Sequence, residues 1–275
     1  MVEQRFDTGT ASINYMVEGR EDGAPIVFLH GVTGRWQAWL PAMTAFAAEW
    51  RVYALDLRGH GWSGHVPDGY RVMDYAADVA AFLRRPVERP AVLVGHSLGA
   101  MVSIAVAAEA PDAVRAVVLE DPPLGAFSDQ RMTERAEHPR FIAMRDLARA
   151  RLPADRLFAA LMELQPGGDP TLVGPRVVSY SQMDPEVLTP ILEDRAKEGY
   201  ELEARLGRIA CPVLLQQGNV ALGAALEDER AAKARRLLAN CSFRYFGDVG
   251  HGIHTDQPFE FCRNVREFLE SLGGG

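Results

Sequence analysis

The chain has 275 residues, 48% of them hydrophobic and 24% charged, which is enough to bury one substantial core. Its formal net charge is -8 and its isoelectric point is about 5.4. An acidic balance of this kind argues against nucleic acid or an anionic membrane as the natural partner.

Cysteine usage and the N-terminus indicate the compartment. Cys211, Cys241 and Cys262 are scattered and form no CxxC pair, so they argue against a disulfide framework. No window approaches the ~18 consecutive apolar residues of a membrane span. Residues 1–5 lack a charged-then-apolar signal pattern. We therefore expect a cytoplasmic protein, working as a monomer or homodimer, without a membrane partner.

The first part of the chain alternates short apolar, β-branched runs with helical patterns, which is typical of a parallel sheet with crossover helices. In chain order, the predicted elements are strands at 2–7, 11–18 and 25–29, a helix at 36–48, a strand at 51–56, a helix at 73–83, a strand at 91–94, a helix at 100–110 and a strand at 114–119.

The pattern changes after Leu124. From there to about Leu206 the chain lacks strand signals and is rich in Arg, Glu and Met, with the clearest helices at 141–150 and 155–164. Alternation then returns with a strand at 212–216, a helix at 229–239, a strand at 242–246 and a helix at 259–272. We predict an α/β core of residues 1–124 and 207–275, with residues 125–206 as a helical insertion.

The segment Gly95-His96-Ser97-Leu98-Gly99 matches the pattern G-x-S-x-G. A buried strand precedes it and a helix follows, so we interpret it as a nucleophile elbow and not as a simple Gly-Ser turn. A serine on such a turn is strained, with its hydroxyl above the sheet, and the glycines prevent collisions where strand and helix crowd together. It also stands at a helix N-terminus, which favours developing negative charge. The motif predicts Ser97 as a nucleophile.

Three more segments accompany the elbow: Leu29-His30-Gly31, the glycine-rich loop from Asp56 to Gly64, and Gly250-His251-Gly252. In this order, the four segments resemble the α/β-hydrolase superfamily, and in particular its esterase and lactonase branch. The resemblance covers nearly the whole chain. It implies the α/β-hydrolase fold, with a mostly parallel eight-stranded sheet flanked by helices, and makes the insertion a helical cap. It implies little about the substrate.

The resemblance also implies roles for particular residues. The base is His251, because an imidazole with a pKa near 6.5 can take and return the serine proton. The oxyanion hole consists of the backbone N–H groups of Val32 and Leu98, and His30 organises the loop that carries Val32. His254 creates a His-x-x-His spacing with His251, but no Glu or Cys completes a ligand set. We expect neither a metal nor a cofactor.

The acid departs from the family pattern. The superfamily usually places it in a G-x-x-D stretch after the strand that follows the insertion, where this chain reads Gly218-Asn219-Val220-Ala221. Some members place it one strand earlier, where Asp121 stands, and we predict Asp121. If Asp121 only caps its Asp-Pro-Pro loop, the acid is Glu227, Asp228 or Glu120. A degraded triad with Asn219 is a minor alternative.

The substrate pocket is predicted from the loops around the elbow and from the insertion. The candidate residues are His30, Gly31, Trp36, His96, Phe141, Met144 and Phe158. The apolar residues of the insertion recur at helical spacing, so we favour packing within the insertion and against the core over a membrane or partner surface, with some of these residues facing the pocket. The arginines of the insertion are interspersed with acids, which indicates a solvated face and not an anion trap.

From these residues we expect a serine hydrolase that cleaves a small carboxylic ester or lactone through an acyl-enzyme. The alternatives on the same residues are an amidase, a carbon–carbon hydrolase, a perhydrolase and a hydroxynitrile lyase. A non-catalytic ligand-binding protein of the same fold is the alternative from another class, because Ala221 stands where a carboxylate is usual.

Overall fold

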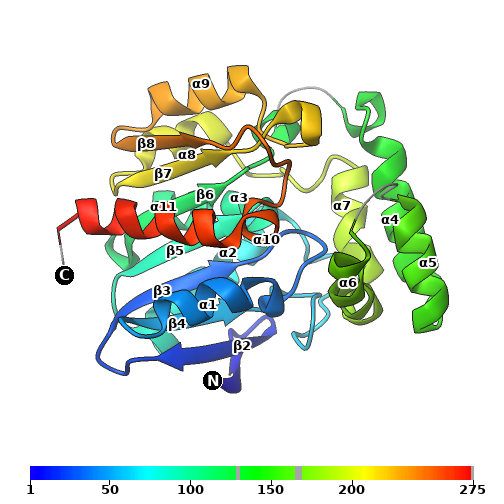
Figure 1. Ribbon diagram of the computed structural model, residues 1–275, viewed down its shortest axis with the longest axis horizontal. Helices are drawn as coiled ribbons and strands as arrows, with labels where there is room; N and C mark the ends of the chain where they lie inside the picture. The colour runs from blue at the N-terminus through cyan, green and yellow to red at the C-terminus, as the bar shows by residue number, and fades with distance from the viewer. Residues whose placement is uncertain (128–130, 165–168, 274–275) are drawn as a thin grey trace.

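A computed structural model describes residues 1–127, 131–164 and 169–273. Within them lies an eight-stranded sheet of order β1-β2-β4-β3-β5-β6-β7-β8 (Figure 1). β1 pairs with β2 and β2 with β4 in antiparallel fashion, and the other pairings are parallel, so the predicted sheet is confirmed. The strands are β1 (Val2–Asp7), β2 (Ser12–Gly19), β3 (Ala24–Leu29), β4 (Trp50–Leu55), β5 (Ala91–His96), β6 (Val114–Glu120), β7 (Val213–Gln217) and β8 (Cys241–Tyr245).

Helices cover both faces of the sheet because its parallel strands are apolar on both sides. On β3, Val27 and Leu29 join the cluster that contains side chains of α2, α3 and α9, while Ile26 and Phe28 join the cluster of α1, α10 and α11. Side chains that alternate along a strand thus feed two cores. The flanking helices are α1 (Leu40–Phe46), α2 (Val72–Phe82), α3 (Leu98–Glu109), α9 (Asp228–Leu237), α10 (Ile253–Asp256) and α11 (Pro258–Ser271).

The helix predicted over 36–48 is wrong as a single element. Residues Trp36–Trp39 form a 3-10 turn, and α1 begins only at Leu40. Pro41 explains the break, because proline has no N–H to continue a helical ladder but fits the first turn of a new helix.

The described chain between β6 and β7 is helical, with α4 (His138–Arg149), α5 (Ala154–Leu164), α6 (Pro170–Gln182), α7 (Thr189–Leu192) and α8 (Leu202–Arg208). α4 to α7 stand together beside one end of the sheet (Figure 1). α8 instead packs against α3 and α9, so the predicted boundary at residue 206 falls inside a core-facing helix.

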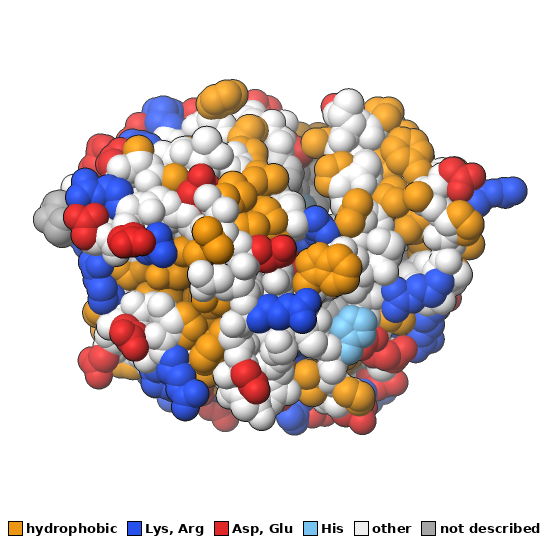
Figure 2. All heavy atoms as spheres, turned by 90° about the horizontal axis from the view of Figure 1, so that it is seen from below, with side chains coloured by type: hydrophobic (Ala, Val, Ile, Leu, Met, Phe, Trp, Pro, Cys, Tyr) orange, Lys and Arg blue, Asp and Glu red, His pale blue; other side chains and the backbone are white. Residues whose placement is uncertain are grey.

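The outer surface carries charges of both signs, interspersed over the face in Figure 2. The same view shows a furrow between the body that holds the sheet and the helices of the insertion. Within the described ranges, no helix has the length and apolar character needed to cross a bilayer.

Candidate active site

Ser97 is the single residue between β5 and α3, and its backbone has an unfavourable positive φ, with φ 52° and ψ -112°. A Cβ on Gly95 would lie 2.3 Å from the carbonyl oxygen of Gly99, and one on Gly99 would lie 2.1 Å from that of Leu29. Strand and helix therefore cross too closely for any side chain at these two positions. The turn has the strained geometry expected of a nucleophile elbow.

Asp121 occupies the corresponding place one strand along, directly after β6, and it too has a positive φ, 42°. Its carboxylate is fully buried and accepts backbone hydrogen bonds from Ala225 at 2.6 Å and from Gly218 and Leu226 at 3.3 Å each. These donors replace the water that a buried carboxylate loses.

His251 lies in the loop between β8 and α10, and its Nδ1 is 2.6 Å from Oδ2 of Asp121. Because a carboxylate accepts here, the proton sits on Nδ1 and the lone pair of Nε2 is left for another group. The carbonyl oxygen of His251 accepts a hydrogen bond from Nε2 of His96 at 2.8 Å. Since His96 is the neighbour of Ser97, this bond brings the loop of His251 beside the elbow.

The loop after β3 passes over the elbow. A Cβ on Gly31 would lie 2.8 Å from Nδ1 of His96 and 3.3 Å from Cβ of Ser97, so the loop approaches the elbow this closely because residue 31 has no side chain. Leu98 opens α3, where a backbone N–H has no acceptor within the helix. The carbonyl oxygen of Val32 lies 2.7 Å from Nε2 of His60.

His30 supports this loop from inside. Its Nε2 accepts a hydrogen bond from the N–H of Leu57 at 3.0 Å, and its Nδ1 donates to the carbonyl of Gly31 at 2.7 Å. Burial and the nearby His60 hold the pKa of His30 well below its usual value, so the ring is neutral. With both nitrogens used and 1% exposure, His30 lies under the loop and does not face an open pocket.

The same elements recur in known proteins. The sequence model of the alpha/beta hydrolase fold matches residues 24–190. The chain belongs to the α/β-hydrolase family. The superfamily predicted from the motifs is thereby confirmed.

Individual relatives of this α/β-hydrolase differ in chemistry. The chain is 31% identical to the non-heme chloroperoxidase of Streptomyces lividans over 94% of its own length and 96% of the relative's. It is 38% identical to 2-(acetamidomethylene)succinate hydrolase of Mesorhizobium japonicum, but that match covers only 44% of this chain and 42% of the relative. A crystal structure of E-2-(acetamidomethylene)succinate hydrolase superposes with a TM-score of 0.80 at 24% identity, over 98% of this chain and 99% of the other.

The other acids considered for the hydrolase have different partners. Glu120 binds His254, Asp228 accepts a hydrogen bond from Gln217 at 2.6 Å, and Glu227 is half exposed beside Arg230. The side-chain oxygen of Asn219 accepts from the backbone of Ala221. Of the candidate acids, Asp121 is the one bonded to His251.

The remaining pocket candidates lie further out. The backbone N–H of Trp36 donates to Asp56 at 2.8 Å, and its indole packs in the cluster on the α1 side of the sheet. Met144 on α4 is buried in the cluster on the other side, with Phe141 on α4 and Phe158 on α5 partly buried against it. A role for these four residues in binding substrate stays a prediction.

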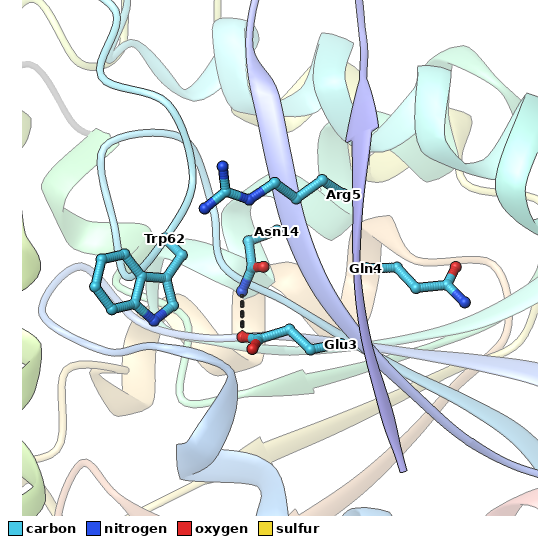
Figure 3. A pocket seen from close by; sticks show the side chains of 5 residues that line it. All are labelled: Glu3, Gln4, Arg5, Asn14 and Trp62. Atoms are coloured by element: carbon cyan, nitrogen blue, oxygen red, sulfur yellow. Dashed lines mark hydrogen bonds between the residues drawn. The ribbon is translucent and has the colours of Figure 1, made fainter.

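The pocket drawn in Figure 3 is separate from this site. Its lining residues are Glu3, Gln4, Arg5, Asn14 and Trp62, from β1, β2 and the loop after β4. β1 and β2 form one edge of the sheet, with β4 and β3 between them and β5, which leads to Ser97. Nothing in the sequence pointed to this pocket, and no residue of the predicted site lines it.

Sequence reasoning did not predict two contacts near the elbow, the one between Glu120 and His254 and the one between His60 and the carbonyl oxygen of Val32. The two histidines were visible as residues of conspicuous motifs, but neither signals its contact. Glu120 continues the alternation of buried side chains along β6, where an acid is out of place. The available signal was Glu120 itself, a charged residue at a strand position that the alternation assigns to the core, where a buried charge needs a partner.

Proposed function

We propose that this α/β-hydrolase cleaves small carboxylic esters or lactones, with Ser97 as nucleophile, His251 as base and Asp121 as acid. The observation that carries the proposal is the 2.6 Å hydrogen bond between Nδ1 of His251 and the buried carboxylate of Asp121, in a loop that His96 ties to the elbow. A base oriented by a carboxylate next to a strained serine is the arrangement that activates a hydroxyl.

In the proposed reaction, Nε2 of His251 takes the proton of Ser97 while Oγ attacks the substrate carbonyl. The backbone N–H groups of Val32 and Leu98 stabilise the resulting oxyanion. The C–O bond to the alcohol breaks, and the alcohol leaves with the proton from His251. Water, deprotonated by His251, then attacks the acyl-enzyme; the bond between the acyl carbon and Oγ breaks, the acid is released, and the proton returns from His251 to Ser97.

We also propose that the helices of the insertion act as a cap over Ser97. The furrow of Figure 2 between these helices and the sheet body supports an entry route there. Phe141, Met144 and Phe158 are the residues of the cap that we assign to the pocket wall, with Gly31, Trp36 and His96 on the core side. A cap of this kind excludes water and selects the acyl or alcohol group.

The test is covalent labelling of Ser97 with a fluorophosphonate, together with turnover of 4-nitrophenyl esters and lactones of graded chain length. The wild type should label and turn over, and Ser97→Ala should do neither. A folded wild type that resists the probe and turns over no substrate would instead support a non-catalytic ligand-binding protein.

Amide hydrolysis is the second candidate, and it is favoured by the 26% identity to pyrrolizixenacetamide deacetylase of Xenorhabdus hominickii, over 97% of this chain and 98% of the relative. The two candidates share Ser97, His251 and the oxyanion N–H groups, and differ in the leaving group. Matched pairs that carry one acyl group on an alcohol or on an amine separate them: an amidase retains a comparable kcat/KM on the amide, and an esterase does not.

A further inference from the structure

A row of polar side chains crosses the sheet next to the proposed active site. His96, Glu120 and Gln216 stand near the ends of β5, β6 and β7 and pair across the strands, His96 with Glu120 and Glu120 with Gln216. Glu120 and Gln216 have 0% exposure. Two positions before each of them, on the same face of the sheet, stands a buried aliphatic residue that packs in the cluster beneath α1 and α11. These residues are Val94, Val118 and Leu214. Packing alone would favour an aliphatic side chain at the three positions of the row.

Each of the first two residues precedes a residue of the active site. The positive φ angles of Ser97 and Asp121 turn these residues out of the strand geometry at the carboxyl ends of β5 and β6. The preceding residues, His96 and Glu120, remain in the row. β5 and β6 thus end in the same way. The last strand residue, His96 or Glu120, lies on one face of the sheet, and the next residue, Ser97 or Asp121, leaves the strand.

His96 and Glu120 hold the backbone on either side of the turn that follows His251. Nε2 of His96 donates to the carbonyl oxygen of His251 at 2.8 Å. Oε1 of Glu120 accepts from the backbone N–H of His254 at 2.8 Å, and both carboxylate oxygens lie 2.8 Å from Nδ1 of His254. The ring of His254 stacks on Trp39 with centroids 4.1 Å apart and planes inclined by 23°. The segment 251–254 is therefore fixed at its first and last residues.

The charge of Glu120 strengthens this fixation. Burial raises the pKa of Glu120, but His254 and His96 outweigh burial and hold that pKa below its usual value, so the carboxylate is ionised. The N–H of His254 lies in the first turn of α10, where backbone donors have no acceptor within the helix. A carboxylate from the neighbouring strand satisfies it with a charge-assisted hydrogen bond, which is stronger than a neutral one.

We propose that Glu120, His254 and His96 are positioning residues that hold His251 in register with Asp121 and Ser97. The inference rests on the proposed serine hydrolase function. Asp121 fixes the ring of His251, and the three positioning residues fix the backbone that carries it. A displacement of the base by about 1 Å costs about 10²-fold in rate, so a change in this buried cluster reaches the chemistry without touching substrate.

Glu120→Gln tests the proposal because it keeps the volume of the side chain and removes its charge. We expect kcat on a 4-nitrophenyl ester to fall by about 10- to 100-fold, with KM within about two-fold, because ground-state binding is untouched. His254→Gln keeps a donor toward Glu120 and serves as the second variant, with the same direction of change.

The matched control is Arg205→Gln. The buried Arg205 on α8 forms an ion pair with the exposed Glu109 on α3, so replacing Arg205 destabilises the fold without contacting the segment 251–254. We expect a lower midpoint of urea unfolding and an unchanged kcat. Loss of stability alone therefore does not produce the expected result.

Proton NMR of the Nδ1–H of His251 separates this inference from the proposed function. The short bond to Asp121 predicts a far-downfield resonance, which should shift or broaden in Glu120→Gln and stay unchanged in Arg205→Gln. Folded Glu120→Gln and His254→Gln proteins with kcat within two-fold of wild type and an unaltered resonance would overturn the positioning role. If the wild type neither labels nor turns over, the proposed function fails, while the NMR comparison still decides whether Glu120 positions His251.

Discussion

Replacing Asp121 by asparagine removes one charge while preserving the shape of the side chain. The carboxylate accepts from two sides: Oδ2 from His251 and Ala225 at 2.6 Å each, and Oδ1 from Gly218 and Leu226 at 3.3 Å each. An amide has one oxygen, so its NH₂ group must face backbone donors wherever it points. The orientation with the oxygen toward His251 is favoured, because it keeps the two shorter bonds.

The magnitudes follow from this geometry. A carboxylate and an imidazolium with charge centres roughly 4 Å apart interact by about 4 kcal/mol at an effective dielectric constant of about 20. Losing that stabilisation in the transition state lowers kcat by about 10³-fold. Two backbone donors left without an acceptor cost about 1–3 kcal/mol each, less here because their bonds are long, so we expect a loss of about 2–4 kcal/mol in stability.

The assay is kcat on a 4-nitrophenyl ester, with urea unfolding measured in parallel. Glu227→Gln and Asp228→Asn are the controls, since both were candidate acids on sequence grounds and both contact other groups; each should keep kcat within about two-fold. Full activity in a folded Asp121→Asn protein would refute the assignment of the acid. A large loss of kcat in either control would then point to that residue as the acid.

Three further outcomes follow from distances and pKa shifts. Gly31→Val should lower fluorophosphonate labelling by at least about 10-fold, because its Cβ would lie 2.8 Å from Nδ1 of His96 and 3.3 Å from Cβ of Ser97; undiminished labelling of a folded protein would contradict this. Gly99→Ala should destabilise by about 3 kcal/mol or more in urea unfolding, since its Cβ would lie 2.1 Å from a carbonyl oxygen of β3, whereas Gly207→Ala, in open space on α8, should stabilise by about 0.5–1 kcal/mol. Burial, with the neighbouring His251 and His254, lowers the pKa of His96 to about 3. The unfolded chain takes up this proton near pH 6.5 and the folded chain does not, so stability declines as pH falls from 6.5 toward 3. His96→Phe should flatten that decline by up to about 1.4 kcal/mol per pH unit in urea titrations, and an equal slope in both proteins would exclude His96 as its source.

Local patterns were sufficient for the elements that depend on neighbours in the chain. The strand at 91–96, the glycines at 95 and 99 and the helix from 98 define the elbow within a single stretch, because strain, crossing and helix start are all local properties. Alternating apolar strands and helices likewise determined a mostly parallel sheet. The helix predicted over 36–48 failed for a local reason that was available, the proline at 41.

Contacts between distant segments were decided by the tertiary structure alone. The place of Asp121 directly after β6 favoured it as the acid on sequence grounds, but Glu120, Glu227 and Asp228 stayed open as alternatives until the contact with His251 was visible. Glu120 is the last residue of β6 and pairs with His96 and Gln216, whereas Asp121 follows the end of the strand with a positive φ. That one-residue difference assigns one acid to His251 and the other to His254, because Glu120 keeps the strand conformation and the backbone of Asp121 leaves it. Periodicity in the chain thus determined which residues are buried, and only the packing of strands and loops determined which polar groups meet.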